Sequence, residues 1–86
     1  MANYRPIVAI LCGGLGTRMR PVLGDLPKAL APLDGRPFLF HLLDQARRIG
    51  AERVVLLTGW GGAQIRRAIG RRYCGIPVDY VYDPDS

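Results

Sequence analysis

The chain has 86 residues, of which 49% are hydrophobic, and it carries a formal net charge of +5. A chain of this length forms one small domain with a thin core, because such domains remove only about 60–65% of their unfolded surface from water. No segment has the roughly 20 uninterrupted apolar residues of a membrane span, and the start is too short and polar for a signal peptide, so we expect a cytoplasmic location. The positive charge indicates an anionic partner, which could be nucleic acid, anionic lipid or the phosphates of a small molecule.

Two rare residue types carry further information. Cys12 and Cys74 form no C-x-x-C pair and have no nearby set of histidine ligands, so structural thiols are favoured over a disulfide or a metal site. Eleven of the twelve basic residues are arginine, and Lys28 is the single lysine. A compact ammonium group is therefore used at one position where arginine is otherwise the rule.

The first predicted element is a strand over Ile7–Leu11, where the sequence is continuously apolar and rich in β-branched residues. Such a run is typical of a strand that is buried on both faces in a parallel sheet. It ends at a turn that contains Gly13, Gly14 and Gly16. Because these residues lack a Cβ, the backbone can turn sharply there and expose its N–H groups.

Residues 17–37 contain four prolines and two glycines, which exclude a long helix. We expect an ordered loop with one helical turn near Arg18 and a short extended piece over Leu30–Leu33, closed by a turn at Asp34 and Gly35. A loop of about 20 residues is uncommon in a small domain unless it is functional or disordered. The leucines that recur along it argue against disorder.

A helix is predicted to begin at Pro37 and to end at Gly50. Arg47 and Arg48 fall in its last turn, where positive charge favours the negative end of the helix dipole. His41 lies near the apolar stripe, which favours a structural histidine over a catalytic base. The stripe follows the i, i+3, i+4, i+7 spacing of a helix with one buried face and comprises Leu39, Leu42, Leu43 and Ala46.

The remaining sequence predicts a buried strand over Val54–Leu57, a shorter helix and a last strand. Gly61 and Gly62 weaken the start of this helix, which is marked by Ile65, Ala68 and Ile69. The last strand is indicated by alternation at Val78, Tyr80 and Tyr82. This order predicts an α/β fold with a three-layer, Rossmann-like, mostly parallel sheet, of which residues 1–86 form the N-terminal half, incomplete at the C-terminus.

The glycine turn is a candidate anion site, because it leaves the carboxyl end of the first strand and can present successive N–H groups. A Walker loop is excluded, since no Gly-Lys pair occurs in the sequence. The dinucleotide fingerprint G-x-G-x-x-G is also excluded, since Met19 stands where its third glycine belongs. By itself, a glycine-rich turn after a strand is more often a tight turn than a ligand site.

The segment becomes specific when its motifs are taken together. They are Leu11-Cys12-Gly13-Gly14-Leu15-Gly16-Thr17-Arg18-Met19-Arg20-Pro21, then Leu26-Pro27-Lys28, and then Ala31-Pro32-Leu33-Asp34-Gly35-Arg36-Pro37. This pattern resembles the N-terminal part of the sugar-1-phosphate nucleotidyltransferase family. Within the family it is most similar to the branch of heptose-1-phosphate guanylyltransferases, and mannose-1-phosphate guanylyltransferases and related uridylyltransferases are close behind. The resemblance implies transfer of a nucleotidyl group from a nucleoside triphosphate, with GTP favoured, to a sugar 1-phosphate, which gives a nucleotide-sugar and pyrophosphate.

The resemblance also implies roles for individual residues. Arg18 and Lys28 are the expected catalytic residues: the guanidinium would hold the β and γ phosphates, and the ammonium would neutralise the α-phosphate region or the incoming sugar phosphate. Thr17 could equally cap a helical turn. The expected nucleotide-binding residues are Leu11, Gly13, Gly14, Gly16 and Thr17.

Two departures from the family pattern limit what this chain can supply. Cys12 stands where the family usually has alanine, a small change at the end of a strand. Mg²⁺ is the implied cofactor, but its ligands are expected after residue 86, and Asp83 and Asp85 do not match the metal-binding motif. No metal ligand is therefore predicted within this chain.

Two other functional classes are compatible with parts of the sequence. The pairs Arg47-Arg48, Arg66-Arg67 and Arg71-Arg72 suggest a nucleic-acid-binding domain, but they lack interleaved aromatic residues for base stacking. A non-catalytic nucleotide-binding or regulatory module is a second alternative. The favoured partners are a nucleoside triphosphate and a sugar 1-phosphate, without nucleic acid or membrane, and a homo-oligomer is left open.

The 86-residue chain alone is expected to bind nucleoside triphosphates weakly and to catalyse no transfer, because the metal ligands and half of the sheet are missing from it. A pyrophosphate-release assay on the purified chain checks this expectation. Release above the buffer background would contradict it.

Overall fold

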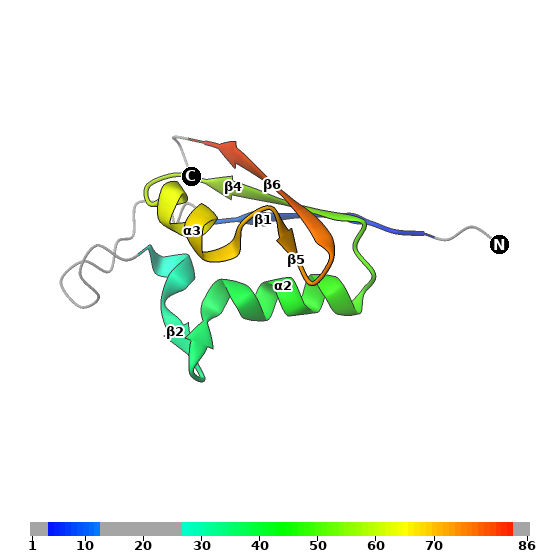
Figure 1. The fold of residues 1–86 in the computed structure, drawn as a ribbon, viewed down its shortest axis with the longest axis horizontal. Helices are drawn as coiled ribbons and strands as arrows, with labels where there is room; N and C mark the ends of the chain where they lie inside the picture. The colour runs from blue at the N-terminus through cyan, green and yellow to red at the C-terminus, as the bar shows by residue number, and fades with distance from the viewer. Residues whose placement is uncertain (1–3, 13–26, 84–86) are drawn as a thin grey trace.

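The computed structural model describes residues 4–12 and 27–83, and its central feature is a four-stranded sheet (Figure 1). The strand order is β1-β4-β6-β5; β1, β4 and β6 run parallel, and β5 is an antiparallel edge strand. Sequential parallel strands are thus direct neighbours, as βαβ units require. The bounds are β1 Ile7–Leu11, β4 Arg53–Thr58, β5 Arg72–Tyr73 and β6 Ile76–Tyr82.

Two helices connect the parallel strands, and both lie on the same side of the sheet in Figure 1. Helix α2, Phe38–Arg48, joins β1 to β4, and helix α3, Gly62–Ile69, joins β4 to β6. The core between helices and sheet is formed by apolar side chains that are at most 4% exposed: Leu39, Leu43, Ala46, Ala51, Val54, Leu56, Ile65 and Val78. The mixed α/β class and the mostly parallel sheet are therefore confirmed.

The second face of the sheet is mostly apolar and open among the described residues, and the Arg53–Asp79 ion pair is its charged part. Ile7 and Leu11 are 61% and 73% exposed, and Val81 on β6 shares this face with them. The expectation that Ile7–Leu11 is buried on both faces is wrong, because among the residues that the structure describes β1 is an edge strand and helices cover one face only. The described residues thus supply two layers of the expected three.

The loop before α2 is more regular than the sequence indicated. It contains a 3₁₀ turn, η2 at Lys28–Leu30, and a two-stranded hairpin of β2, Pro32–Leu33, and β3, Arg36–Pro37. Asp34 and Gly35 join these strands with φ angles of 52° and 81°, as a two-residue hairpin turn with two positive φ angles requires. Cys74 and Gly75 form a similar turn between β5 and β6, which the sequence analysis missed.

Both predicted helices are present, with small differences in their buried faces. Helix α2 begins one residue after Pro37, and Gly50 follows its end at a φ of 78°. Leu42 is only half-buried, because Leu39, Leu43 and Ala46 define the face toward the sheet. Ala68 is exposed, and Ile65 alone among the residues of α3 is fully buried.

Three polar side chains tie β3, α2 and β5 together. Arg36 donates to Asp44 Oδ2 at 2.6 Å and to the Tyr73 hydroxyl at 2.8 Å, and that hydroxyl donates to Asp44 Oδ1 at 2.7 Å. Tyr73 also packs edge-on against the ring of Phe40, with centroids 5.6 Å apart. Tyr73 therefore combines an aromatic packing contact with a place in the polar network. The hydrogen bonds from Arg36 and then Tyr73 hold the pKa of Asp44 below its usual value.

Replacing Asp44 with asparagine is expected to lower the thermal unfolding midpoint at pH 7, because the Arg36 guanidinium and the Tyr73 hydroxyl lose their charged partner. A depressed pKa in the folded state gives a contribution that is fully present above about pH 4, the pKa of an unfolded aspartate, and is lost as the pH falls through the folded-state value. The difference between wild type and Asp44→Asn should therefore shrink toward about pH 2. Asp34→Asn, in the exposed hairpin turn, is the control, and equal midpoints for wild type and Asp44→Asn at pH 7 would contradict the prediction.

Candidate functional site

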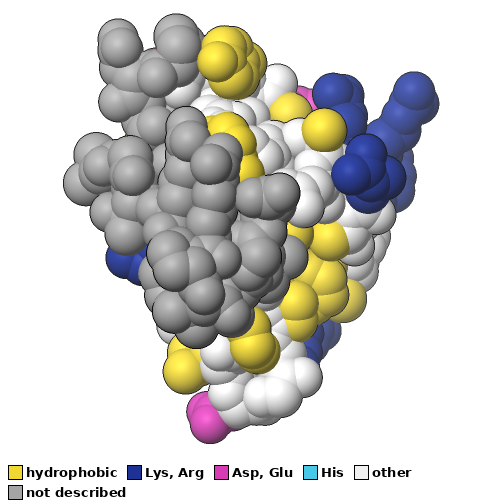
Figure 2. Space-filling view, turned by 90° about the vertical axis from the view of Figure 1, so that its left-hand side faces the viewer, with side chains coloured by type: hydrophobic (Ala, Val, Ile, Leu, Met, Phe, Trp, Pro, Cys, Tyr) yellow, Lys and Arg dark blue, Asp and Glu magenta, His cyan; other side chains and the backbone are white. Residues whose placement is uncertain are grey.

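A small pocket lies at the carboxyl end of β1, where the sequence predicts a ligand site. Its volume is about 200 Å³. Figure 2 looks onto this end of the molecule, where hydrophobic side chains surface next to basic ones. In open α/β sheets, ligands bind outside the carboxyl ends of the strands. The lining residues come from β1, η2 and the start of α2 and are Leu11, Cys12, Lys28, Ala29 and Phe38.

The end of β1 supplies one wall through two residues that point in opposite directions. Leu11 is 73% exposed, whereas Cys12 is buried, as the alternation of a strand requires. The backbone N–H of Cys12 donates to the carbonyl of Leu57 at 2.8 Å, so hydrogen bonding to β4 continues one residue beyond the end of β1. Burial raises the pKa of the Cys12 thiol to about 11, which keeps it protonated and a poor nucleophile at neutral pH.

Lys28 reaches the pocket from the 3₁₀ turn η2. The turn is closed by hydrogen bonds from Leu30 N to Pro27 O, at 2.9 Å, and from Ala31 N to Lys28 O, at 3.0 Å. Ala29 and Leu30 are buried, whereas the Lys28 side chain is left exposed. The turn is therefore anchored by its two apolar residues, and its one charged side chain is free to meet an anion.

The first residue of α2 completes the pocket. Phe38 is 42% exposed, and its N–H donates to the carbonyl of Ala31 at 2.8 Å, which joins the helix start to the end of η2. One turn further along, His41 Nε2 lies 2.7 Å from the carbonyl of Leu33 and donates to it. His41 thus holds the β2–β3 hairpin on the helix, which agrees with the structural role expected for it.

The structure brings together two of the residues that the sequence singled out. Leu11 and Lys28, which are separated by 17 positions in the chain, line the same pocket. The other candidate residues, Gly13, Gly14, Gly16, Thr17 and Arg18, lie outside the described residues and remain predictions.

Sequence reasoning missed Ala29 and Phe38 as lining residues. Ala29 adjoins the Pro-Lys motif, and Phe38 follows the Gly-x-Pro motif directly, so proximity to these motifs was the available signal. Apolar residues gave no chemical reason to select them. Their place in the pocket depends on how η2 folds back onto α2, which the composition of the loop does not specify.

A second, larger pocket lies beside the carboxyl ends of β4 and β6 and has a volume of about 470 Å³. The Arg66 guanidinium lies 4.9 Å from the centroid of the Tyr80 ring, a cation–π contact in the wall of this pocket. The second pocket is lined by Thr58, Gly59, Gly61, Gly62, Ala63, Arg66, Tyr80 and Tyr82.

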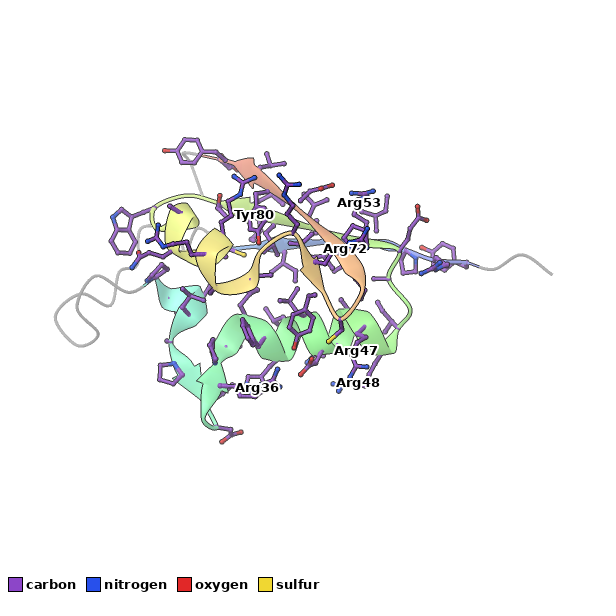
Figure 3. All side chains as sticks on the ribbon, viewed as in Figure 1. Arg36, Arg47, Arg48, Arg53, Arg72 and Tyr80 are labelled. Carbon is purple, nitrogen blue, oxygen red and sulfur yellow. The ribbon has the colours of Figure 1, made fainter. Side chains whose placement is uncertain are left out.

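Most of the labelled arginines lie far from both pockets. In Figure 3, Arg47, Arg48, Arg53 and Arg72 lie toward the opposite end of the sheet, where the strands begin. Arg53 is paired there with Asp79, at 2.8 Å. These four guanidinium groups therefore cannot neutralise a ligand at the carboxyl end of β1.

Two further properties concern the described residues only. Within residues 4–12 and 27–83, no three His, Cys, Asp or Glu side chains gather as a metal-binding cluster. No helix in the described part of the chain is both long enough and apolar enough to cross a membrane.

The two cysteines are expected to differ sharply in reactivity. Both are free thiols, but Cys12 is buried with a pKa raised to about 11, whereas Cys74 is exposed in the β5–β6 turn. Iodoacetamide at pH 8 should therefore alkylate Cys74 more than about 10-fold faster than Cys12, because the thiolate is the reacting species. Peptide mass spectrometry measures both rates, denaturant provides the control by exposing Cys12, and equal rates in the folded chain would contradict the prediction.

The chain is similar in sequence to curated sugar-phosphate nucleotidyltransferases. The D-glycero-α-D-manno-heptose 1-phosphate guanylyltransferase of Aneurinibacillus thermoaerophilus is 42% identical over 76 residues, which are 88% of this chain and 33% of that protein. The UTP–glucose-1-phosphate uridylyltransferase AglF of Haloferax volcanii is 37% identical over 90% of this chain and 32% of its own length. The chain thus spans about a third of the length of each of these two relatives.

A solved structure shows the same fold. The crystal structure of HddC from Yersinia pseudotuberculosis superposes with a TM-score of 0.74 and 32% identity, over 91% of this chain and 35% of that one. Its complex with GMP-PN gives a TM-score of 0.68, with 33% identity over the same shares of the two chains. The family model of the MobA-like NTP transferase domain matches residues 8–86. With the parallel sheet, the pocket at the end of β1 and these relatives in agreement, the chain belongs to the MobA-like NTP transferase domain family of nucleotidyltransferases.

Proposed function

We propose that the protein containing this chain transfers GMP from GTP to a sugar 1-phosphate, a heptose 1-phosphate in the first instance, and releases pyrophosphate. The observation that carries the proposal is the pocket in which Leu11 and Lys28 meet at the carboxyl end of β1. It combines an exposed strand end, which can pack against a base or ribose, with the one ammonium side chain of the chain.

The reaction is difficult mainly for electrostatic reasons. An oxygen of the sugar phosphate forms a bond to the α-phosphorus of the nucleotide, and the bond from that phosphorus to the bridging oxygen breaks as pyrophosphate leaves. Both reactants are anions, and two unit charges about 4 Å apart repel by about 4 kcal/mol at an effective dielectric constant of 20. The protein must therefore neutralise charge and align the reactants in line.

Lys28 is suited to this task by its place in the fold. Its backbone is fixed by the hydrogen bonds of η2, whereas its side chain extends into solvent beside the pocket. A compact ammonium can approach a single phosphate oxygen as a point charge. We assign it the neutralisation of the α-phosphate region or of the incoming sugar phosphate.

The remaining roles fall on the turn that follows β1. Arg18 holds the β and γ phosphates with its planar fork and absorbs charge as pyrophosphate departs. No side chain attacks the phosphorus in this scheme, and the protonated, buried Cys12 next to the turn is consistent with that. The backbone amides of Gly13, Gly14 and Gly16 and the hydroxyl of Thr17 bind the nucleotide, with Leu11 against the base and ribose.

The choice of GTP and of a heptose phosphate rests on the relatives. A heptose 1-phosphate guanylyltransferase at 42% identity and an HddC structure complexed with GMP-PN favour guanine. A uridylyltransferase follows at 37% identity, which makes UTP the second candidate nucleotide. Divalent-metal dependence is proposed for the whole enzyme. Mg²⁺ would supply further neutralisation of phosphate charge.

The test is a pyrophosphate-release screen on the whole natural protein, with the four nucleoside triphosphates against a panel of sugar 1-phosphates. The Lys28→Ala and Arg18→Ala variants are each expected to lower kcat about 10²–10³-fold, the usual loss when one group that stabilises transition-state charge is removed. Lys28→Arg, which keeps the charge but not its compact shape, should recover part of that loss.

Arg48→Ala is the matched control, because it removes one positive charge at the opposite end of the sheet. It should leave kcat within about two-fold of wild type, since solvent screens exposed charges beyond about 10 Å. The proposal would be overturned if none of the substrate pairs gave pyrophosphate release. It would also be overturned if Lys28→Ala and Arg48→Ala lowered kcat equally.

A further inference from the structure

The turn between β4 and α3 touches the Pro-Lys motif more closely than any side chain would allow. A Cβ at Gly61 would lie 2.4 Å from Cγ of Pro27 and 3.0 Å from its Cβ. Separations below 3 Å are essentially forbidden between carbon atoms, so the proline ring rests directly on the bare backbone of the glycine.

This contact is transmitted to Lys28 because Pro27 directly precedes it and is rigid. The Pro27 side chain is less than 2% exposed, and its backbone φ is fixed near −60° by the ring. The Pro27 carbonyl also accepts the hydrogen bond that begins η2, from Leu30 N at 2.9 Å. A displacement of the ring must therefore move the backbone of the turn that carries Lys28.

The β4–α3 turn cannot move away from Pro27. The next residue, Gly62, is equally confined, since a Cβ there would lie 2.9 Å from Oγ1 of Thr58. Thr58 is buried at the end of β4, the strand that is paired on both sides. Pro27 is therefore held against a surface that is itself fixed to the middle of the sheet.

We propose that Gly61 is a positioning residue: its missing side chain lets the β4–α3 turn support Pro27 and so sets the place of Lys28 at the nucleotide pocket. The inference rests on the proposed function, which gives Lys28 its role in neutralising phosphate. It assigns a purpose to a glycine that the sequence analysis treated only as a weak helix start.

The backbone conformation of Gly61 has to be separated from its contact with Pro27. Gly61 has a φ of 84°, which by itself disfavours any other residue. Gly75 has nearly the same φ, 85°, but no atom lies within 4 Å of the Cβ position there. Alanine at either position therefore carries the same kind of backbone strain, and only alanine at position 61 collides with Pro27.

Because Lys28 is the single lysine, selective labelling makes it directly visible. Lysine-selective ¹⁵N labelling of the 86-residue chain gives one backbone amide resonance, which reports on the position of Lys28. The Gly61→Ala substitution should shift this resonance, whereas Gly75→Ala should leave it in place. Equal shifts in the two variants, or no shift in Gly61→Ala, would overturn the inference.

The dependence on Pro27 is tested by a double-mutant cycle. Pro27→Gly removes both of the ring atoms that an alanine at position 61 would meet. In that background, adding Gly61→Ala should produce no further shift of the Lys28 amide, whereas the same shift in both backgrounds would contradict a route through the ring. Should Gly61→Ala alone fail to fold, the double variant Pro27→Gly/Gly61→Ala takes its place: recovery of folding supports the collision with the ring, and a double variant that also fails to fold, while Pro27→Gly alone folds, overturns the inference.

A kinetic measurement on the whole protein separates positioning from general destabilisation. Gly61→Ala should lower kcat about 10²-fold with little change in the KM for the nucleotide, because a displacement of about 1 Å at a charge-neutralising group acts mainly on the transition state. Gly75→Ala should leave both constants near wild type, and equal effects of the two variants would count against the inference. If the wild-type enzyme releases no pyrophosphate at all, the proposed function fails, while the amide shifts still decide whether Gly61 sets the place of Lys28.

Discussion

The burial of β4 is the constraint on which the rest of the described structure depends. This strand pairs with β1 on one side and with β6 on the other, and its residues Val54 and Leu56 are at most 1% exposed beneath the helices. Burying one such side chain contributes about 1.5–3 kcal/mol, so the strand fixes the register of both neighbours. Because all three strands run parallel, that register brings their carboxyl ends to one edge of the sheet.

Two series of contacts connect β4 to the pocket at the end of β1. On one side, the N–H of Cys12 pairs with Leu57 of β4, so the strand end that precedes the glycine turn is fixed by the central strand. On the other side, Thr58 of β4 confines Gly62, and the adjacent Gly61 supports Pro27. The positions of the end of β1 and of the turn that carries Lys28 are therefore both fixed by contacts that lead to β4, although neither segment belongs to that strand.

The sequence predicted the elements whose pattern has a simple physical period. Alternation and continuous apolar runs indicated β1, β4 and β6, and the stripe of α2 was correct apart from Leu42. The exposed face of β1 could not be read in the same way, since Ile7–Leu11 is apolar throughout and its burial depends on what lies next to it. The β5–β6 hairpin was not predicted because cysteine, unlike asparagine, aspartate or glycine, is not typical of a turn position with positive φ, which Cys74 occupies.

The residues of the candidate site also differ in whether the sequence alone could identify them. A charged residue within a motif, such as Lys28, can be selected from the sequence because its chemistry suggests a partner. Phe38 and Gly61 cannot, because their contributions are a surface and an absence of atoms, and these acquire meaning only when Ala31 and Pro27 lie against them.

This difference bears on the role proposed for Lys28. A flexible ammonium on an exposed side chain has many conformations, and only a backbone held in place keeps its reach within the pocket. Hydrogen bonds hold η2 from within, and the buried Pro27 ring holds it from the side of the sheet. The specificity of the motif thus lies as much in the proline that stands before the lysine, and in the glycine beneath that proline, as in the charge itself.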